Sequence, residues 1–154
     1  MIHTKILNLA GGNIEGAIRE SASVLLRGGL VAFPTETVYG LGADAFNRAA
    51  VAREFEAKGS PTDNPLIVHI SGMEQLSSIA RTVSENAQKL AETFWPGPLT
   101  IVIEHRGSIP SVVTAGLPTV AVRVPNHPIA LSLITMVGTG LVGPSANLSG
   151  KPSP

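Results

Sequence analysis

Short apolar runs alternate along this chain with segments that have the spacing and the capping residues of helices. The runs are rich in β-branched or aromatic side chains, which favours strands. They cover Lys5–Leu9, Leu30–Phe33, Leu66–Ile70, Thr100–Glu104, Val120–Val124 and Leu141–Gly143. Strands that alternate with helices usually form one sheet covered by those helices. The sequence therefore predicts a single α/β domain over residues 1–154, with a mainly parallel or mixed sheet.

Capping residues and chain breakers indicate where the helices begin and end. Asn13 is expected to cap a helix over 14–27, and Asn47 a helix that ends at Lys58-Gly59. Two capping boxes, Ser71-x-x-Glu74 and Thr82-x-x-Glu85, predict two more helices. A last helix is expected after Asn126, with Pro128 in its first turn.

The composition narrows the class of protein. Charged residues make up 14% of the 154 residues, and eleven basic side chains balance eleven acidic ones. A net charge of zero gives no general electrostatic footprint for nucleic acid or for an anionic membrane. The chain has no cysteine, which excludes disulfides and thiolate metal sites. No signal peptide and no apolar run of ~20 residues is evident, so a soluble cytoplasmic protein is expected.

A polar cluster directly follows the apolar run Leu30–Phe33. Pro34 ends that strand because it has no N–H to donate, and two threonines, a glutamate and a tyrosine come next. Gly40 and Gly42 then suit a loop whose backbone approaches a ligand. Polar residues at the end of a buried strand are where open α/β sheets place ligands.

Most of the common catalytic and nucleotide-binding motifs are missing from the sequence. The chain contains no phosphate-binding G-x-x-x-x-G-K-[ST] loop and no dinucleotide-binding G-x-G-x-x-G. Its four histidines form neither an i, i+4 pair nor a cluster, so no metal site is predicted. Gly143-Pro-Ser145-Ala-Asn147 is similar to a nucleophile elbow, although Asn147 replaces the final glycine. A serine hydrolase acting through Ser145 is therefore an alternative.

Five segments together resemble the YrdC/Sua5 family, in its order and at similar spacings. They are Pro34-Thr-Glu-Thr-Val-Tyr-Gly-Leu-Gly42, Asn64-Pro-Leu-Ile-Val-His69, Trp95-Pro-Gly-Pro-Leu-Thr100, Val120-Ala-Val-Arg-Val-Pro125 and Pro144-Ser-Ala-Asn-Leu-Ser-Gly150. The resemblance implies a twisted open mixed sheet flanked by helices, with a large concave cavity. It also implies a threonylcarbamoyl-AMP synthase, which makes threonylcarbamoyl-adenylate and pyrophosphate from L-threonine, bicarbonate or CO2, and ATP. Other proteins then use the product to form N6-threonylcarbamoyladenosine (t6A) in tRNA.

The resemblance also implies which residues bind the substrates. For L-threonine they are Thr35, Thr37, His69 and Arg123. For ATP, which brings Mg²⁺ with it, they are Lys58, Ser60, Asn64, Thr119, Ser145 and Asn147. Lys58 is the expected catalytic residue because it would neutralise phosphate charge.

The pattern of residues agrees with these roles at one strand in particular. Arg123 alternates with Val122 and Val124, and an arginine on a central strand is expected to meet an anion. Thr119 shares the face of Arg123 by the period of two.

The sequence departs from the family pattern at two places, and both lie in the part of the expected site that would bind ATP. The family has Lys-x-Arg where this chain has Lys58-Gly-Ser60, and serine supplies no charge. The chain ends at Pro154, directly after a glycine-rich loop, which suggests that closing elements of the family domain are absent. These departures leave open a second interpretation, a non-catalytic module that binds double-stranded RNA or a protein partner.

Overall fold

The structure, a computed structural model, describes residues 3–154. Its elements, in chain order, are η1 (Leu9–Gly11), α1 (Ile14–Leu26), β1 (Val31–Phe33), β2 (Gly40–Asp44), α2 (Arg48–Lys58), β3 (Ile67–His69), α3 (Met73–Ile79), α4 (Glu85–Phe94), β4 (Ile101–Glu104), α5 (Ser111–Thr114), β5 (Thr119–Arg123), α6 (Pro128–Val137) and β6 (Leu141–Val142). Strands and helices alternate through most of the chain, as the sequence predicts.

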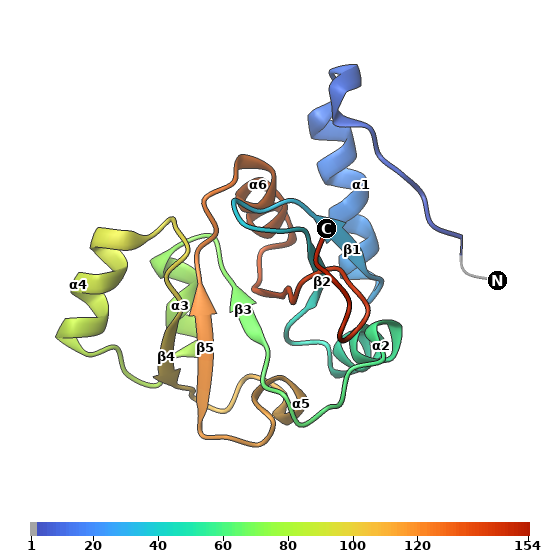
Figure 1. Cartoon of the computed structure of the whole chain (residues 1–154). Helices are drawn as coiled ribbons and strands as arrows, with labels where there is room; N and C mark the ends of the chain where they lie inside the picture. Colours follow the sequence, from blue (N-terminus) through green and yellow to red (C-terminus); the bar gives the residue numbers. More distant parts are fainter. Residues whose placement is uncertain (1–2) are drawn as a thin grey trace.

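The six strands form one open sheet in the order β1-β2-β6-β3-β5-β4 (Figure 1). Within the described residues, β3 and β5 are the parallel pair, and the other neighbours run antiparallel. The α/β class and the mixed sheet are confirmed, whereas a mainly parallel sheet is wrong. The parallel pair places His69 beside Arg123 in register.

Helices cover the sheet in two groups, one for each hydrophobic cluster. On one face, α1 and α6 lie side by side and pack on Phe33 and Leu141 (Figure 1). On the other face, buried side chains of α2, α3 and α5 join Val68, Val120 and Val122 in the larger cluster. The alternation along β5 therefore buries Val120 and Val122 and leaves the Arg123 face half-buried.

The strand β2 was expected to be a loop because of its glycines. The side chain of Phe33 explains why glycine is needed there. A Cβ atom added to Gly42 would lie 2.9 Å from Phe33 Cε1, and one added to Gly40 would lie 3.2 Å from Phe33 Cζ. The glycines let an aromatic ring on the neighbouring strand pack directly against the backbone of β2. A second element was also not predicted: the sequence pattern does not indicate the four-residue helix α5.

Several local predictions were wrong. Lys5–Leu9 is not a strand, since this segment has no ladder partner among the residues that the structure describes and leads into η1. Neither Ser71 nor Thr82 caps a helix: α3 follows Gly72 without a side-chain cap, and α4 is capped by Ser84.

The cap of α6 was also misassigned. His127, rather than Asn126, caps this helix, with its ring accepting a hydrogen bond from the Ile129 N–H. Asn13 and Asn47 do cap α1 and α2, as predicted.

Candidate active site

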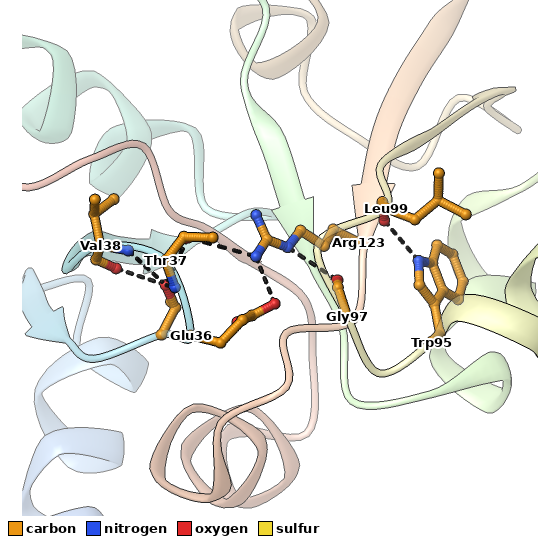
Figure 2. A network of polar contacts seen from close by, with 8 residues as sticks. Glu36, Thr37, Val38, Trp95, Gly97, Leu99 and Arg123 are labelled. Atoms are coloured by element: carbon orange, nitrogen blue, oxygen red, sulfur yellow. Dashed lines mark hydrogen bonds and ion pairs between the residues drawn. The ribbon is translucent and has the colours of Figure 1, made fainter.

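Arg123, at the end of β5, is at the centre of a polar network (Figure 2). Its Nη2 donates to Glu36 Oε1 at 2.6 Å and lies 3.5 Å from Thr37 Oγ1, and its Nε donates to the Gly97 carbonyl at 3.2 Å. The side chains of Arg123 and Glu36 are only 11% and 19% exposed. The other terminal nitrogen, Nη1, donates no hydrogen bond to any of residues 3–154. The guanidinium is therefore held in place through Nε and Nη2, and Nη1 is the nitrogen that lacks a partner in this part of the chain.

The ion pair keeps Glu36 charged. Burial raises the pKa of Glu36, but hydrogen bonds from Arg123 and from backbone N–H groups outweigh that effect, and the net pKa is lowered. The pair is mostly shielded from water, so its attraction is screened less than that of a surface pair.

The loop between β1 and β2 presents Thr37 to Arg123. Thr35 Oγ1 accepts from the backbone N–H groups of Thr37 and Val38, both at 3.2 Å, and donates to the Val38 carbonyl at 2.6 Å. Such bonds from a threonine to its own backbone fix a turn. The Thr35 hydroxyl is therefore used to shape the loop, whereas the Thr37 hydroxyl contacts two side chains, Thr35 Oγ1 at 3.1 Å and Arg123 Nη2 at 3.5 Å.

His69 is adjacent to Arg123 but is a buried side chain. It is 4% exposed, and its Nδ1 has no partner among the described residues. Burial and, next, the charge of Arg123 lower the pKa of His69 to about 4, so the ring is neutral at pH 7. The ring packs edge-on to Phe33, with centroids 6.1 Å apart. Gly143 is needed beside it, because a Cβ there would lie 2.9 Å from Nδ1.

Lys58, the last residue of α2, is 8% exposed. Its ammonium group donates to the carbonyl of Ser145 and, at 2.7 Å, to that of Asn147. Its own carbonyl accepts from the Ser149 N–H at 2.9 Å. Lys58 therefore ties the loop that follows β6 to the end of α2.

The loop after β6 also joins the loop that carries Thr37. Gly40 and Ser145 form an isolated β-bridge, and the Ala146 N–H donates to the Tyr39 carbonyl at 2.8 Å. The Asn147 side chain bonds within its own segment, to the carbonyls of Leu148 and Lys151. Two groups of expected site residues, one around Arg123 and one around Lys58, thus meet through residues 39–41.

Three expected ATP residues lie apart from these groups. Thr119 begins β5 and Arg123 ends it, which separates them by roughly 13 Å along the strand. Asn64 is exposed in the turn before β3, and Ser60 follows the glycine that caps α2. Within residues 3–154, no hydrogen bond joins Ser60, Asn64 or Thr119 to Arg123 or Lys58.

Sequence reasoning did not select Glu36 or Gly97, the two residues that hold Arg123. A signal existed for Glu36, because an acid between two threonines after a buried strand is unusual in a chain with few charges. Gly97 acts through its backbone carbonyl, which no side-chain pattern can indicate.

The chain is similar to known proteins in sequence and in fold. Residues 23–154 match the family profile Sua5/YciO/YrdC, which is described as telomere recombination. The chain belongs to the Sua5/YciO/YrdC family. It is 54% identical over 151 residues to the threonylcarbamoyl-AMP synthase of Pyrococcus abyssi, an alignment that covers 98% of this chain and 44% of that protein. It is 52% identical over 138 residues to the enzyme of the same name from Bacillus subtilis, covering 89% and 40%.

A solved structure shares the Sua5/YciO/YrdC fold of this chain. The crystal structure of Pyrococcus abyssi Sua5 complexed with L-threonine superposes with a TM-score of 0.89 and 56% identity, over 91% of this chain and 41% of that one. The chain spans less than half the length of these relatives.

No group of three or more histidine, cysteine, aspartate or glutamate side chains in residues 3–154 is arranged to hold a metal ion. Over the same residues, no helix has both the length and the apolar character needed to cross a membrane.

Proposed function

We propose that this domain binds L-threonine beside ATP and forms threonylcarbamoyl-adenylate and pyrophosphate, with bicarbonate or CO2 as the carbon source. The product would serve t6A formation in tRNA through other proteins. The observation that carries the proposal is the Arg123 guanidinium. It is held by Glu36 and Gly97, its Nη2 lies 3.5 Å from Thr37 Oγ1, and its Nη1 makes no hydrogen bond within the described residues. The names of the two most similar relatives reported above support the same reaction.

The threonine half of the site would be built on Arg123 and Thr37. A guanidinium edge suits a carboxylate, because it can donate two parallel N–H bonds to the two oxygens. The Thr37 hydroxyl, which lies 3.1 Å from the Thr35 hydroxyl and 3.5 Å from Arg123 Nη2, would bond the substrate. Thr35 would act indirectly by fixing the turn, and neutral His69 would form the floor below.

The chemistry requires positioning more than a protein nucleophile. The neutral amine of threonine attacks CO2 and loses a proton, which gives a carbamate. A carbamate oxygen then attacks the α-phosphorus of ATP, and the bond to the pyrophosphate oxygen breaks. Holding the two substrates in line can supply most of the rate, and cationic groups must neutralise the leaving pyrophosphate.

The ATP half would lie on the Lys58 side. An ammonium group has three donors, and Lys58 uses two of them on the carbonyls of Ser145 and Asn147. The third is available for a phosphate, with Ser145 beside it. Ser60, Asn64 and Thr119 would extend this half toward the other end of β3 and β5. Because no cluster of metal ligands occurs in the described residues, Mg²⁺ is expected to arrive on the phosphates of ATP.

The test of this function is pyrophosphate release by the purified chain. Release is expected only when L-threonine, bicarbonate, ATP and Mg²⁺ are all present, and each omission should reduce it to background. Calorimetric titration with L-threonine alone gives a second readout, since the residues proposed to bind threonine are in a different hydrogen-bond group from Lys58. Pyrophosphate release that is independent of threonine, or the absence of threonine binding, would contradict the proposal.

One observation favours a non-catalytic binding module instead. Ser60 stands where the family pattern has arginine, which removes a charge from the phosphate side. A titration against double-stranded RNA over a range of salt concentrations separates this case. RNA affinity that falls steeply with salt, in a chain that releases no pyrophosphate, would favour the binding module.

Restoring the missing charge gives a prediction for ATP. The Ser60→Arg variant is expected to bind ATP roughly 10-fold more tightly, because a guanidinium can donate charge-assisted bonds to phosphate. Ser78→Arg, which adds the same charge at an exposed position on α3, is the matched control. ATP affinity is measured by calorimetry, and equal affinities of the two variants would show that position 60 does not face the nucleotide.

A further inference from the structure

Glu36 lies inside the proposed threonine site, and the reaction described above gives it no role. Its Oε1 is 2.6 Å from Arg123 Nη2, and its side chain is 19% exposed. A carboxylate has about four lone-pair directions. The bonds from Arg123 and from the backbone N–H groups of Glu36 and Asn126 use three of them and leave one. Glu36 can therefore accept a further hydrogen bond while it remains paired with Arg123.

Glu36 and the side chains around it have no net charge, but the positive and the negative charge lie at different positions in the site. Arg123 carries the positive charge, Glu36 the negative one, and His69 and Thr37 are neutral. A ligand that has only a carboxylate would gain the guanidinium but would be repelled by Glu36. A ligand with a carboxylate and an ammonium group one carbon apart complements both charges.

We propose that Glu36 and Arg123 together select the zwitterion of an α-amino acid, with Arg123 Nη1 bonding the α-carboxylate and Glu36 accepting a bond from the α-ammonium. Glu36 is then a specificity residue for the amino-acid substrate. This inference rests on the proposed function, because it assigns a partner to the amino group of the same threonine. It also gives a reason for Glu36 to be paired with Arg123, although Arg123 would have to bind the carboxylate of the substrate as well.

Two other roles for Glu36 would give different results. If Glu36 were only a counter-ion that a ligand displaces, its removal would strengthen the binding of every carboxylate to Arg123. If Glu36 only oriented Arg123, its removal would weaken the binding of every carboxylate. Selection of a zwitterion weakens the binding of the amino acid alone.

The experiment compares two ligands that differ in the amino group. L-Threonine and (R)-3-hydroxybutyrate have the same carbon skeleton, carboxylate and hydroxyl, and the second lacks the α-ammonium. Both are titrated calorimetrically into the unaltered chain, the Glu36→Gln variant and a Glu15→Gln control. Glu15 is also a carboxylate paired with an arginine, but its side chain is 77% exposed on α1.

The Glu36→Gln variant is expected to lose roughly 10- to 100-fold in affinity for L-threonine, the range for a bond to a charged group. Its affinity for (R)-3-hydroxybutyrate should stay within about threefold of the unaltered chain or increase, since repulsion is removed. Glu15→Gln should change neither.

Parallel changes for the two ligands, in either direction, would overturn the role of Glu36 and leave threonine binding itself intact. Failure of the unaltered chain to bind L-threonine would instead overturn the proposed function, and the zwitterion site with it. Thermal unfolding of Glu36→Gln shows whether a loss of both affinities comes from misfolding. In that case Glu36→Asp, which keeps the charge, would have to retain the preference for L-threonine over (R)-3-hydroxybutyrate, and a lost preference would overturn the role.

Discussion

Replacing Arg123 by lysine is expected to weaken L-threonine binding roughly 100-fold, within the range measured when one partner of a buried charge pair is altered. Lysine keeps the positive charge but loses the planar fork, so it cannot hold Glu36 and Gly97 and present a second edge at the same time. Calorimetric titration with L-threonine measures the effect, and threonine-dependent pyrophosphate release should fall with it.

A matched control is available on the surface. Arg106→Lys makes the same chemical change at an exposed arginine that bonds the Ser77 carbonyl, and it is expected to leave threonine affinity unchanged. If Arg123→Lys bound L-threonine as tightly as the unaltered chain, a point charge would be sufficient and the fork would have no role. The assignment of the α-carboxylate to Arg123 Nη1 would then be wrong.

The placement of Arg123 was predictable because it follows from a strict local rule. Side chains alternate along a strand, and Val120 and Val122 occupy the buried face, so the arginine had to lie on the other one. The caps Asn13 and Asn47 were predictable for a similar reason, since each acts within its own first turn. Local rules nevertheless misassigned the caps of α3, α4 and α6, so they predict that a helix is present more securely than the residue that caps it.

What could not be predicted depends on contacts between distant segments. The β2 glycines are required by Phe33 on the neighbouring strand, so their pattern looked like a loop. From the sequence, Lys58 at the end of a helix could have bound a phosphate or backbone carbonyls. In the structure its ammonium group donates to the carbonyls of Ser145 and Asn147, which follow β6. The bond from Arg123 to Gly97 uses a backbone carbonyl, so the amino-acid sequence does not indicate it.

The association of the two halves of the site is also a tertiary effect. The segment after β6 pairs with residues 39–41, and this pairing brings Ser145 to the loop that carries Thr37. The sequence showed polar residues after each strand, but the order of strands in the sheet decides which of them become neighbours. The family resemblance implied a twisted open mixed sheet but did not specify the order of its strands.

Glu54 is expected to make the protein less stable at high pH, because it is a buried acid without a partner. It lies on α2, is 0% exposed, and neither carboxylate oxygen has a hydrogen-bond partner among the described residues. Burial raises the pKa of Glu54 to about 7 from the 4.5 of a solvated glutamate, and the charge of Lys58 offsets this only in part.

The direction of the pH effect follows from the two pKa values. Between pH 4.5 and about 7, the folded state holds the proton of Glu54 more tightly than the unfolded state does. The free energy of unfolding therefore decreases as pH rises through this window, and the loss is complete above it. A pKa difference of this size corresponds to about 3 kcal/mol, because each pKa unit is worth about 1.4 kcal/mol.

The variants Glu54→Gln and Glu54→Met separate ionisation from burial. Glu54→Gln should remove most of this pH dependence, because its side chain does not titrate, although its amide is still buried. Glu54→Met fills a similar volume without polar atoms, and at pH 8 it should raise the free energy of unfolding by about 2–3 kcal/mol. Urea unfolding at pH 5 and pH 8 measures both effects, and Glu56→Gln, an exposed change on the same helix, is the control. If Glu54→Gln and Glu56→Gln had the same difference in unfolding free energy between pH 5 and pH 8, Glu54 would be ionised without cost and must have a partner such as Lys58 in solution.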